Sequence, residues 1–280
     1  MASSEVALLV VMLSVSPLLA TPQDHPTAGT EPPPDAHLVR RFTGDIRAGL
    51  RAPFRRHHHW RRFWLSLTAI GVAAALDNEV RSDVQRNRTG TTDNISDAAR
   101  PFGSVVPLVG FAATWITGRV RHNNELISIG VDGLEASAIT GLLVTPSLKR
   151  AVGRARPFQE EGSSSFRPFS GNSSFPAGEP TEAFTAATVV SEHIHKPWVQ
   201  ASAWGAAGLV GLERINLDRH WLSDVTAAGF ISHGITRFLV HRHRGAGEHP
   251  GGTLASRGSH IQVSPLARGD SRGLLFTFSF

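Results

Sequence analysis

The sequence contains no cysteine, and this absence excludes several kinds of site. Without thiols the chain can form no disulfide framework, no thiolate metal centre and no cysteine nucleophile. If the protein is exported, its hydrophobic core alone must hold it together. The 280 residues are 41% hydrophobic and 18% charged, which is typical of one large packed domain with short tails.

Lysine is scarce as well: Lys149 and Lys196 are the only two, so the net charge of +5 comes almost wholly from arginine. Arginine is concentrated in residues 37–62, where histidines and aromatic residues are interleaved with it. This segment could dock peripherally on anionic lipid head groups, or it could form an amphipathic helix whose aromatic side chains pack inward. Both interpretations stay open. No nucleic-acid partner is expected, because no nucleic-acid-binding motif is present.

Long uncharged runs and strand patterns are also few. Most uncharged runs have roughly 12–17 residues, short of the ~20 that cross a bilayer. With a mean hydropathy of −0.09, these runs indicate buried core helices rather than a polytopic membrane protein. We therefore predict an all-α fold, a bundle of about six core helices. Helical spacing places them over approximately residues 63–76, 102–120, 125–148, 181–194, 198–212 and 222–240.

The two ends of the chain differ from this helical domain, which we assign to residues 63–244. Residues 1–20 are typical of a signal peptide for export to the periplasm or the cell exterior, although an uncleaved membrane anchor stays open. Residues 21–36 form a Pro- and Thr-rich linker that cannot bury enough apolar surface to fold. Residues 245–280 begin Gly-rich, and alternating phenylalanines near the end predict a terminal β-hairpin.

His220 and Asp224 have a spacing suited to nucleophilic chemistry, and Arg214 precedes them closely. Residues four apart on a helix share a face, so the carboxylate could hold the imidazole in one tautomer with its other nitrogen aimed outward. A histidine held in this way is ready to attack phosphorus. A buried structural His–Asp pair would show the same spacing.

Lys149 and Arg156 form a second element. They are seven residues apart, about two helical turns, so we expect both cations to leave one helix face before Pro157 ends the helix. Two such cations suit a phosphate, lysine as a point charge and arginine as a planar fork. A basic helix C-terminus favoured by the macrodipole is the alternative interpretation.

Together these elements resemble the type 2 phosphatidic acid phosphatase and vanadium haloperoxidase superfamily. The first element matches the family motif K-x6-R-P fully, and the second matches S-R-x5-H-x3-D except that Glu213 replaces the serine. The middle motif of the family, P-S-G-H, is altered. Pro176 and Gly178 are kept, whereas Ala177 and Glu179 stand in place of the serine and the histidine.

The resemblance implies a role for each matching residue. His220 would attack phosphorus to form a phosphohistidine, and Asp224 would orient it. Glu179 stands where the general acid belongs, but nearby cations favour its ionised form, so we interpret it first as an acidic residue at a helix N-terminus. The phosphate oxygens would be bound by cations and by the backbone at that helix start: Lys149, Arg156, Arg214 and Gly178.

The function implied is metal-independent and cofactor-free hydrolysis of lipid-linked or small phosphate or diphosphate esters. Loss of a general acid typically costs ~10²–10⁴ in rate, so we expect a weakened enzyme. A diphosphate leaves as phosphate, whose second pKa is ~6, and depends less on that acid than an alkyl ester does. The alternative is an inactive pseudoenzyme that binds phosphate or anionic lipid. A vanadate-dependent haloperoxidase is not expected, because that chemistry also uses the missing histidine and hydroxyl.

Overall fold

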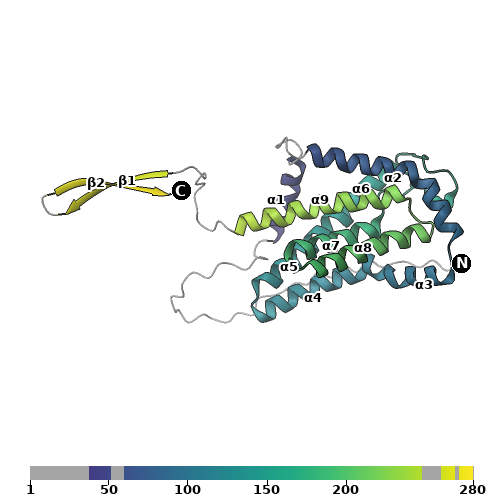
Figure 1. Cartoon of the computed structure of the whole chain (residues 1–280), viewed down its shortest axis with the longest axis horizontal. Helices are drawn as coiled ribbons and strands as arrows, with labels where there is room; N and C mark the ends of the chain where they lie inside the picture. The colour runs from purple at the N-terminus through teal and green to yellow at the C-terminus, as the bar shows by residue number, and fades with distance from the viewer. Residues whose placement is uncertain (1–37, 52–59, 248–259, 269–270, 280) are drawn as a thin grey trace. The chain divides into compact units, whose positions relative to one another are not determined.

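A computed structural model describes residues 38–51, 60–247, 260–268 and 271–279 (Figure 1). Helices form nearly all of the first two ranges, so the predicted all-α class is confirmed. The predicted signal peptide and linker lie outside the described residues. The predicted basic segment contributes α1, and it also supplies the first turn of α2.

The helices follow one another with short connections. The first group is α1 (Leu38–Arg51), α2 (Trp60–Arg86), α3 (Gly90–Ala99), the 3₁₀ turn η3 (Arg100–Gly103) and α4 (Val105–Arg121). The second group is nearly continuous: α5 (Asn124–Ser137), the π-helical η4 (Ala138–Val144) and α6 (Thr145–Val152). After a long loop come α7 (Gly178–His193), α8 (Pro197–Asn216) and α9 (Leu222–Gly247).

Helix α7 lies at the centre of the bundle, where it contacts α5, α8 and α9 (Figure 1). Small residues at its interface with α8, among them Ala183, Ala187 and Ala207, let the two backbones approach closely. A second buried cluster joins α4, α5, α7 and α9 around Phe111 and Leu239. These contacts fix both ends of α7 against its neighbours.

Two helices differ from the sequence-based prediction. Helix α2 continues to Arg86, ten residues beyond the predicted end at residue 76. Helix α3 was missed because its sequence is polar and lacks an apolar stripe. Its start is instead encoded by a capping box. The Thr89 side chain accepts a hydrogen bond from the Thr92 amide, and the Thr92 side chain accepts one from the Thr89 amide.

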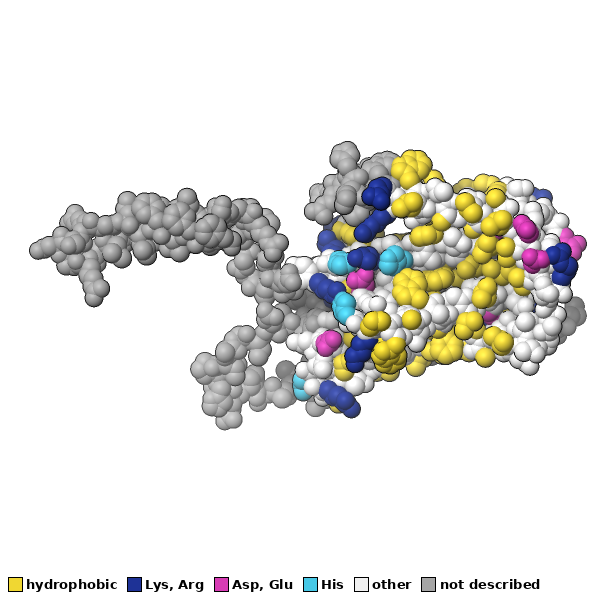
Figure 2. Space-filling view, in the orientation of Figure 1, with side chains coloured by type: hydrophobic (Ala, Val, Ile, Leu, Met, Phe, Trp, Pro, Cys, Tyr) yellow, Lys and Arg dark blue, Asp and Glu magenta, His cyan; other side chains and the backbone are white. Residues whose placement is uncertain are grey.

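Helix α4 corrects the interpretation of the apolar runs as buried core. Only Pro107, Phe111 and Gly118 are buried along it, whereas Val109 and Val120 are 60% and 75% exposed. Two helical stretches, Gly90–Arg121 and Asn124–Val152, are long and apolar enough to cross a membrane. Of the most apolar 18 residues in each stretch, 22% are buried in the first and 56% in the second. Figure 2 shows hydrophobic side chains across the middle of the helical surface, with most charged side chains nearer its two ends.

The chain ends in a two-stranded antiparallel sheet. Strand β1 (His260–Arg268) pairs with β2 (Ser271–Ser279), and Val263 lies opposite Phe276.

Candidate active site

The ends of three helices meet at the candidate site. The amide of Ala177, just before α7, donates a hydrogen bond to the Asp224 carbonyl oxygen at the start of α9 (3.2 Å). After α8, the Arg219 amide donates to the Arg214 carbonyl oxygen (2.9 Å). The turn between α8 and α9 is therefore folded back onto the N-terminus of α7, and the motif residues on these segments come together.

The backbone that carries Lys149 and Arg156 differs from the predicted continuous helix. Helix α6 ends at Val152, and Gly153 adopts φ 58°, where a Cβ would lie 1.8 Å from the Arg167 carbonyl oxygen. Arg156 therefore lies in extended backbone, and the prediction that both cations leave one helix face is wrong.

Both side chains nevertheless reach Ser173. Lys149 Nζ donates to its carbonyl oxygen (2.8 Å) and Arg156 Nη2 to its Oγ (3.3 Å). Lys149 Nζ also lies 3.9 Å from the position that a Cβ on Gly178 would take. The two cations thus face the N-terminus of α7, whose free N–H groups favour an anion.

Arg214 is held by two carboxylates. Its Nε and Nη2 donate to Glu213, and its Nη1 donates to Glu179 Oε1 at 2.7 Å. Burial acts to lower the pKa of Arg214, but the hydrogen bonds that it donates to Glu213 and the charge of Glu179 raise the pKa overall. Glu213, which replaces the motif serine, is 2% exposed and fixes the plane of the guanidinium.

His220 lies just before α9, which begins at Leu222, so the predicted shared helix face is wrong. The first turn of α9 nevertheless brings Asp224 Oδ2 within 3.6 Å of His220 Nδ1. Burial lowers the pKa of His220 more than Asp224 raises it, and Lys149 and Arg156 lower it further. The imidazole is therefore neutral at neutral pH, the state that a nucleophile needs.

Asp224 is held by a buried network that sequence reasoning missed. Its Oδ1 accepts a hydrogen bond from Arg154 Nη1 (2.6 Å), and its Oδ2 accepts from Ser174 Oγ (2.5 Å) and the Trp221 amide (2.9 Å). Arg154 also pairs with Asp77 on α2 (2.6 Å). Burial acts to raise the pKa of Asp224, but hydrogen bonds and Arg154 lower it overall, so the carboxylate is ionised. The position of Arg154 in the basic run after Lys149 was the only signal for this network.

Glu179 lies between Arg214 and His220. Its Oε1 is 2.7 Å from Arg214 Nη1, and its Oε2 is 4.0 Å from His220 Nε2. Burial acts to raise the pKa of Glu179, but Arg214, its own backbone amide, His220 and Lys149 lower it overall. The carboxylate is therefore ionised at neutral pH and stands in the space between the cation and the imidazole.

The predicted site residues are thus brought together, and their roles stay predictions. They share one space at the N-terminus of α7, where charge and hydrogen-bond contacts link them: Lys149, Arg156, Gly178, Glu179, Arg214, His220 and Asp224. His193 contacts Asp132 at the other end of α7 and lies outside this space.

Comparisons with known proteins found one matching family model, sequence relatives and similar solved structures. A family model of the PAP2 superfamily matches residues 133–247. Lipid A 1-phosphatases of Rhizobium johnstonii and Rhizobium etli are 38% and 36% identical over 96 residues, 31% of this chain. The chain spans less than two fifths of the length of these relatives, 37% and 39%.

Two solved structures are similar at lower identity. LpxE of Aquifex aeolicus is 22% identical with a TM-score of 0.47, covering 59% of this chain and 95% of its own. A transmembrane PAP2-type phosphatidylglycerolphosphate phosphatase of Bacillus subtilis is 20% identical with a TM-score of 0.42, covering 75% of this chain and 96% of its own. The spaced motifs, the family model over residues 133–247 and the sequence relatives support the PAP2 superfamily as the family that this chain resembles.

Proposed function

We propose that this protein is a membrane-borne phosphatase that hydrolyses lipid-linked phosphate or diphosphate esters through a phosphohistidine at His220. The observation that carries the proposal is the convergence of Lys149, Arg156 and Arg214 with the His220–Asp224 pair. The names of the sequence relatives suggest the substrate class, a phosphate on an amphiphilic molecule.

The neutral imidazole of His220 directs Nε2 toward the cationic space and would attack phosphorus there. A P–N bond forms while the bond to the leaving oxygen breaks. Asp224, which is ionised, accepts a hydrogen bond from Nδ1–H once the present distance of 3.6 Å shortens, and its charge stabilises the ring, which becomes positive as the P–N bond forms. The three cations neutralise charge on the equatorial oxygens. Water then cleaves the P–N bond and releases phosphate.

Glu179 limits the range of substrates. An ionised carboxylate cannot donate a proton to a leaving alkoxide, and its charge repels a phosphate dianion. A diphosphate leaves as phosphate and needs little protonation. The preferred substrates are therefore diphosphates or activated esters rather than alkyl monophosphates.

The exposed apolar surface supports a position in a membrane. Large hydrophobic residues are exposed on α2 and α4, and together they exceed what single surface residues explain. Contact with lipid along these helices would bring the site to an amphiphilic substrate. Export to the periplasm stays a prediction.

The test compares wild type, His220→Ala and Glu179→His on a prenyl diphosphate and its monophosphate. Wild type should cleave the diphosphate faster, His220→Ala should abolish turnover and labelling by phosphate, and Glu179→His should raise monophosphate turnover by about 10²-fold.

A different outcome would favour the second candidate function, an inactive binder of phosphate or anionic lipid. The ionised carboxylate of Glu179 is the observation that favours it, because it stands where the general acid belongs and cannot donate a proton. In that case wild type and Glu179→His would both be inactive, while His220→Ala would still bind the substrate.

A further inference from the structure

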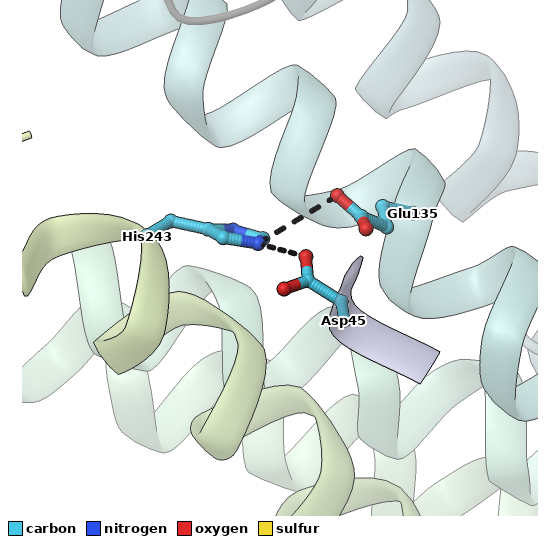
Figure 3. Close-up of side chains that lie close together, drawn as sticks. All are labelled: Asp45, Glu135 and His243. Carbon is cyan, nitrogen blue, oxygen red and sulfur yellow. Dashed lines mark hydrogen bonds and ion pairs between the residues drawn. The ribbon is translucent and has the colours of Figure 1, made fainter. Parts of the chain in front are cut away.

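A second group of ionisable side chains lies near the other end of α9, where α1 and α5 pack against it. Asp45, Glu135 and His243 each offer one donor atom, and these atoms lie within 4.8 Å of one another (Figure 3). From Asp224 to His243, α9 advances 19 residues, about 28 Å at 1.5 Å per residue. This group, the Asp45 cluster, is therefore distinct from the candidate active site.

The contacts of His243 match those of a metal-bound histidine. Its Nε2 lies 2.6 Å from Asp45 Oδ2 and 3.8 Å from Glu135 Oε2. Its Nδ1 lies 2.7 Å from Asp132 Oδ1, and Asp132 also pairs with His193 (2.9 Å). Metal-bound histidines usually donate the remaining ring N–H to a carboxylate, which fixes the tautomer. Asp132 is placed to accept that proton.

Glu135 is the observation that points to a missing ligand. It is 7% exposed, its carboxylate is aimed at the Asp45 cluster (Figure 3), and neither of its oxygens has a hydrogen bond among the described residues. Arg41 Nε forms an ion pair with Oε2 at 3.1 Å, so one cation already contacts this carboxylate. Its other oxygen, Oε1, is buried without a hydrogen bond among the described residues, which is costly unless a further cation binds it.

The charges of the cluster allow the same conclusion. Its carboxylates are Asp45, Asp132 and Glu135, and the guanidiniums paired with them are Arg41 and Arg242. Counting these groups alone leaves one negative charge, which either a proton on His243 or a bound cation would balance.

We propose that Asp45, Glu135 and His243 bind one divalent transition-metal ion, best fitted by Zn²⁺, and that Asp132 orients His243. One imidazole and two carboxylates suit zinc. Bonds of ~2.1 Å in a tetrahedron set donors about 3.4 Å apart. The 2.6 and 3.8 Å separations from His243 Nε2 bracket this value. The ion would tie α1 to α5 and α9, and it is independent of the proposed function.

The experiment uses the full chain in detergent with His57, His58 and His59 changed to glutamine, because consecutive histidines also bind metal. After stripping with a chelator, Zn²⁺ is titrated by calorimetry and bound metal is counted by mass spectrometry. We expect one zinc per chain. Glu135→Gln and His243→Gln should weaken binding by about 100-fold or more, and Asp132→Asn by about 10–100-fold.

His241→Gln is the matched control, because His241 lies on the same helix with a half-exposed side chain paired to Glu192. It should keep full zinc affinity. Failure of the parent protein to bind zinc, or equal weakening in His241→Gln, would overturn the proposal. The first result would mean that a proton on His243 balances the cluster instead. If a ligand variant does not fold, Co²⁺ is added to the parent protein instead. Co²⁺ bound in a tetrahedral site gives a visible absorption band, which supports the proposal, and the absence of this band contradicts it.

Discussion

The two ends of α7 and α9 carry different groups of ionisable side chains. Cations gather at the N-termini of these helices, where Lys149, Arg156 and Arg214 face the space beside His220. Carboxylates gather near the C-termini, where Asp132 and its neighbours face His193 and His243.

The groups on α7 and α9 themselves follow the helix macrodipole, which favours anions at N-termini and cations at C-termini, because Glu179 and Asp224 lie in the first turns and His193 and Arg244 in the last. The cations Lys149, Arg156 and Arg214 come to the N-terminal end from other segments, whereas Asp45, Asp132 and Glu135 come to the C-terminal end from α1 and α5. In our proposals an anion binds at the first end and a cation at the second.

The largest effect on stability should come from changing Arg154. This buried residue lies behind the candidate active site and would not contact the substrate. Arg154 is 2% exposed and pairs with both Asp77 and Asp224. Arg154→Met leaves two buried carboxylates without their cation, so the free energy of unfolding should fall by about 3–5 kcal/mol. Chemical denaturation measures the loss.

Arg150→Met is the matched control, because Arg150 lies on the neighbouring α6 and is exposed. It should change the unfolding free energy by no more than about 0.5 kcal/mol. An equally small change for Arg154→Met would mean that this end is not held together by its internal ion pairs.

An intermediate effect is expected between the two charged ends, on the exposed apolar face of α4. Val109→Lys places a charge where we propose hydrocarbon, at a cost of about 2.5–3.5 kcal/mol near the bilayer centre. The fraction of chain that resists carbonate extraction from membranes should fall.

Val120→Lys provides the comparison, because Val120 is even more exposed but lies one residue from the end of α4. A lysine there can extend to the interface and should leave extraction unchanged. Equal behaviour of the two variants would place α4 in water.

The sequence predicted the helices with strong apolar periodicity and the residues of the candidate site. It could not predict which apolar faces stay exposed, because the apolar residues of α4 do not themselves say which helices pack on them. Local patterns also failed for the Lys149–Arg156 geometry, where Gly153 ends the helix early.

The sequence also could not predict contacts between residues that are distant along the chain, because local patterns do not record tertiary packing. Asp77 contributes to the Asp224 network from α2, and Asp45 reaches Glu135 from α1; no motif marks either residue. Motifs record the groups that contact a ligand, whereas the residues that hold those groups are defined only by tertiary packing.

The smallest effect concerns the carboxylate of Glu179, which lies among the cations at the N-terminus of α7. Because the pKa of Glu179 is lowered, the group is ionised throughout the neutral range and competes with an anion for Arg214. Glu179→Gln should therefore raise the affinity for sulfate about tenfold at pH 7, which is 1.4 kcal/mol. Sulfate suits the measurement by calorimetry, since its charge is constant above pH 4.

The sign of the pH dependence separates this mechanism from a general change of charge. As the pH falls through the lowered pKa of Glu179, wild type gains a proton there and its sulfate affinity should rise toward that of the variant. Glu161→Gln removes an equal charge from an exposed loop carboxylate and should show neither the gain at pH 7 nor the convergence at low pH. A gap between Glu179→Gln and wild type that persists in acid would show that the carboxylate acts by its shape and not by competing for Arg214.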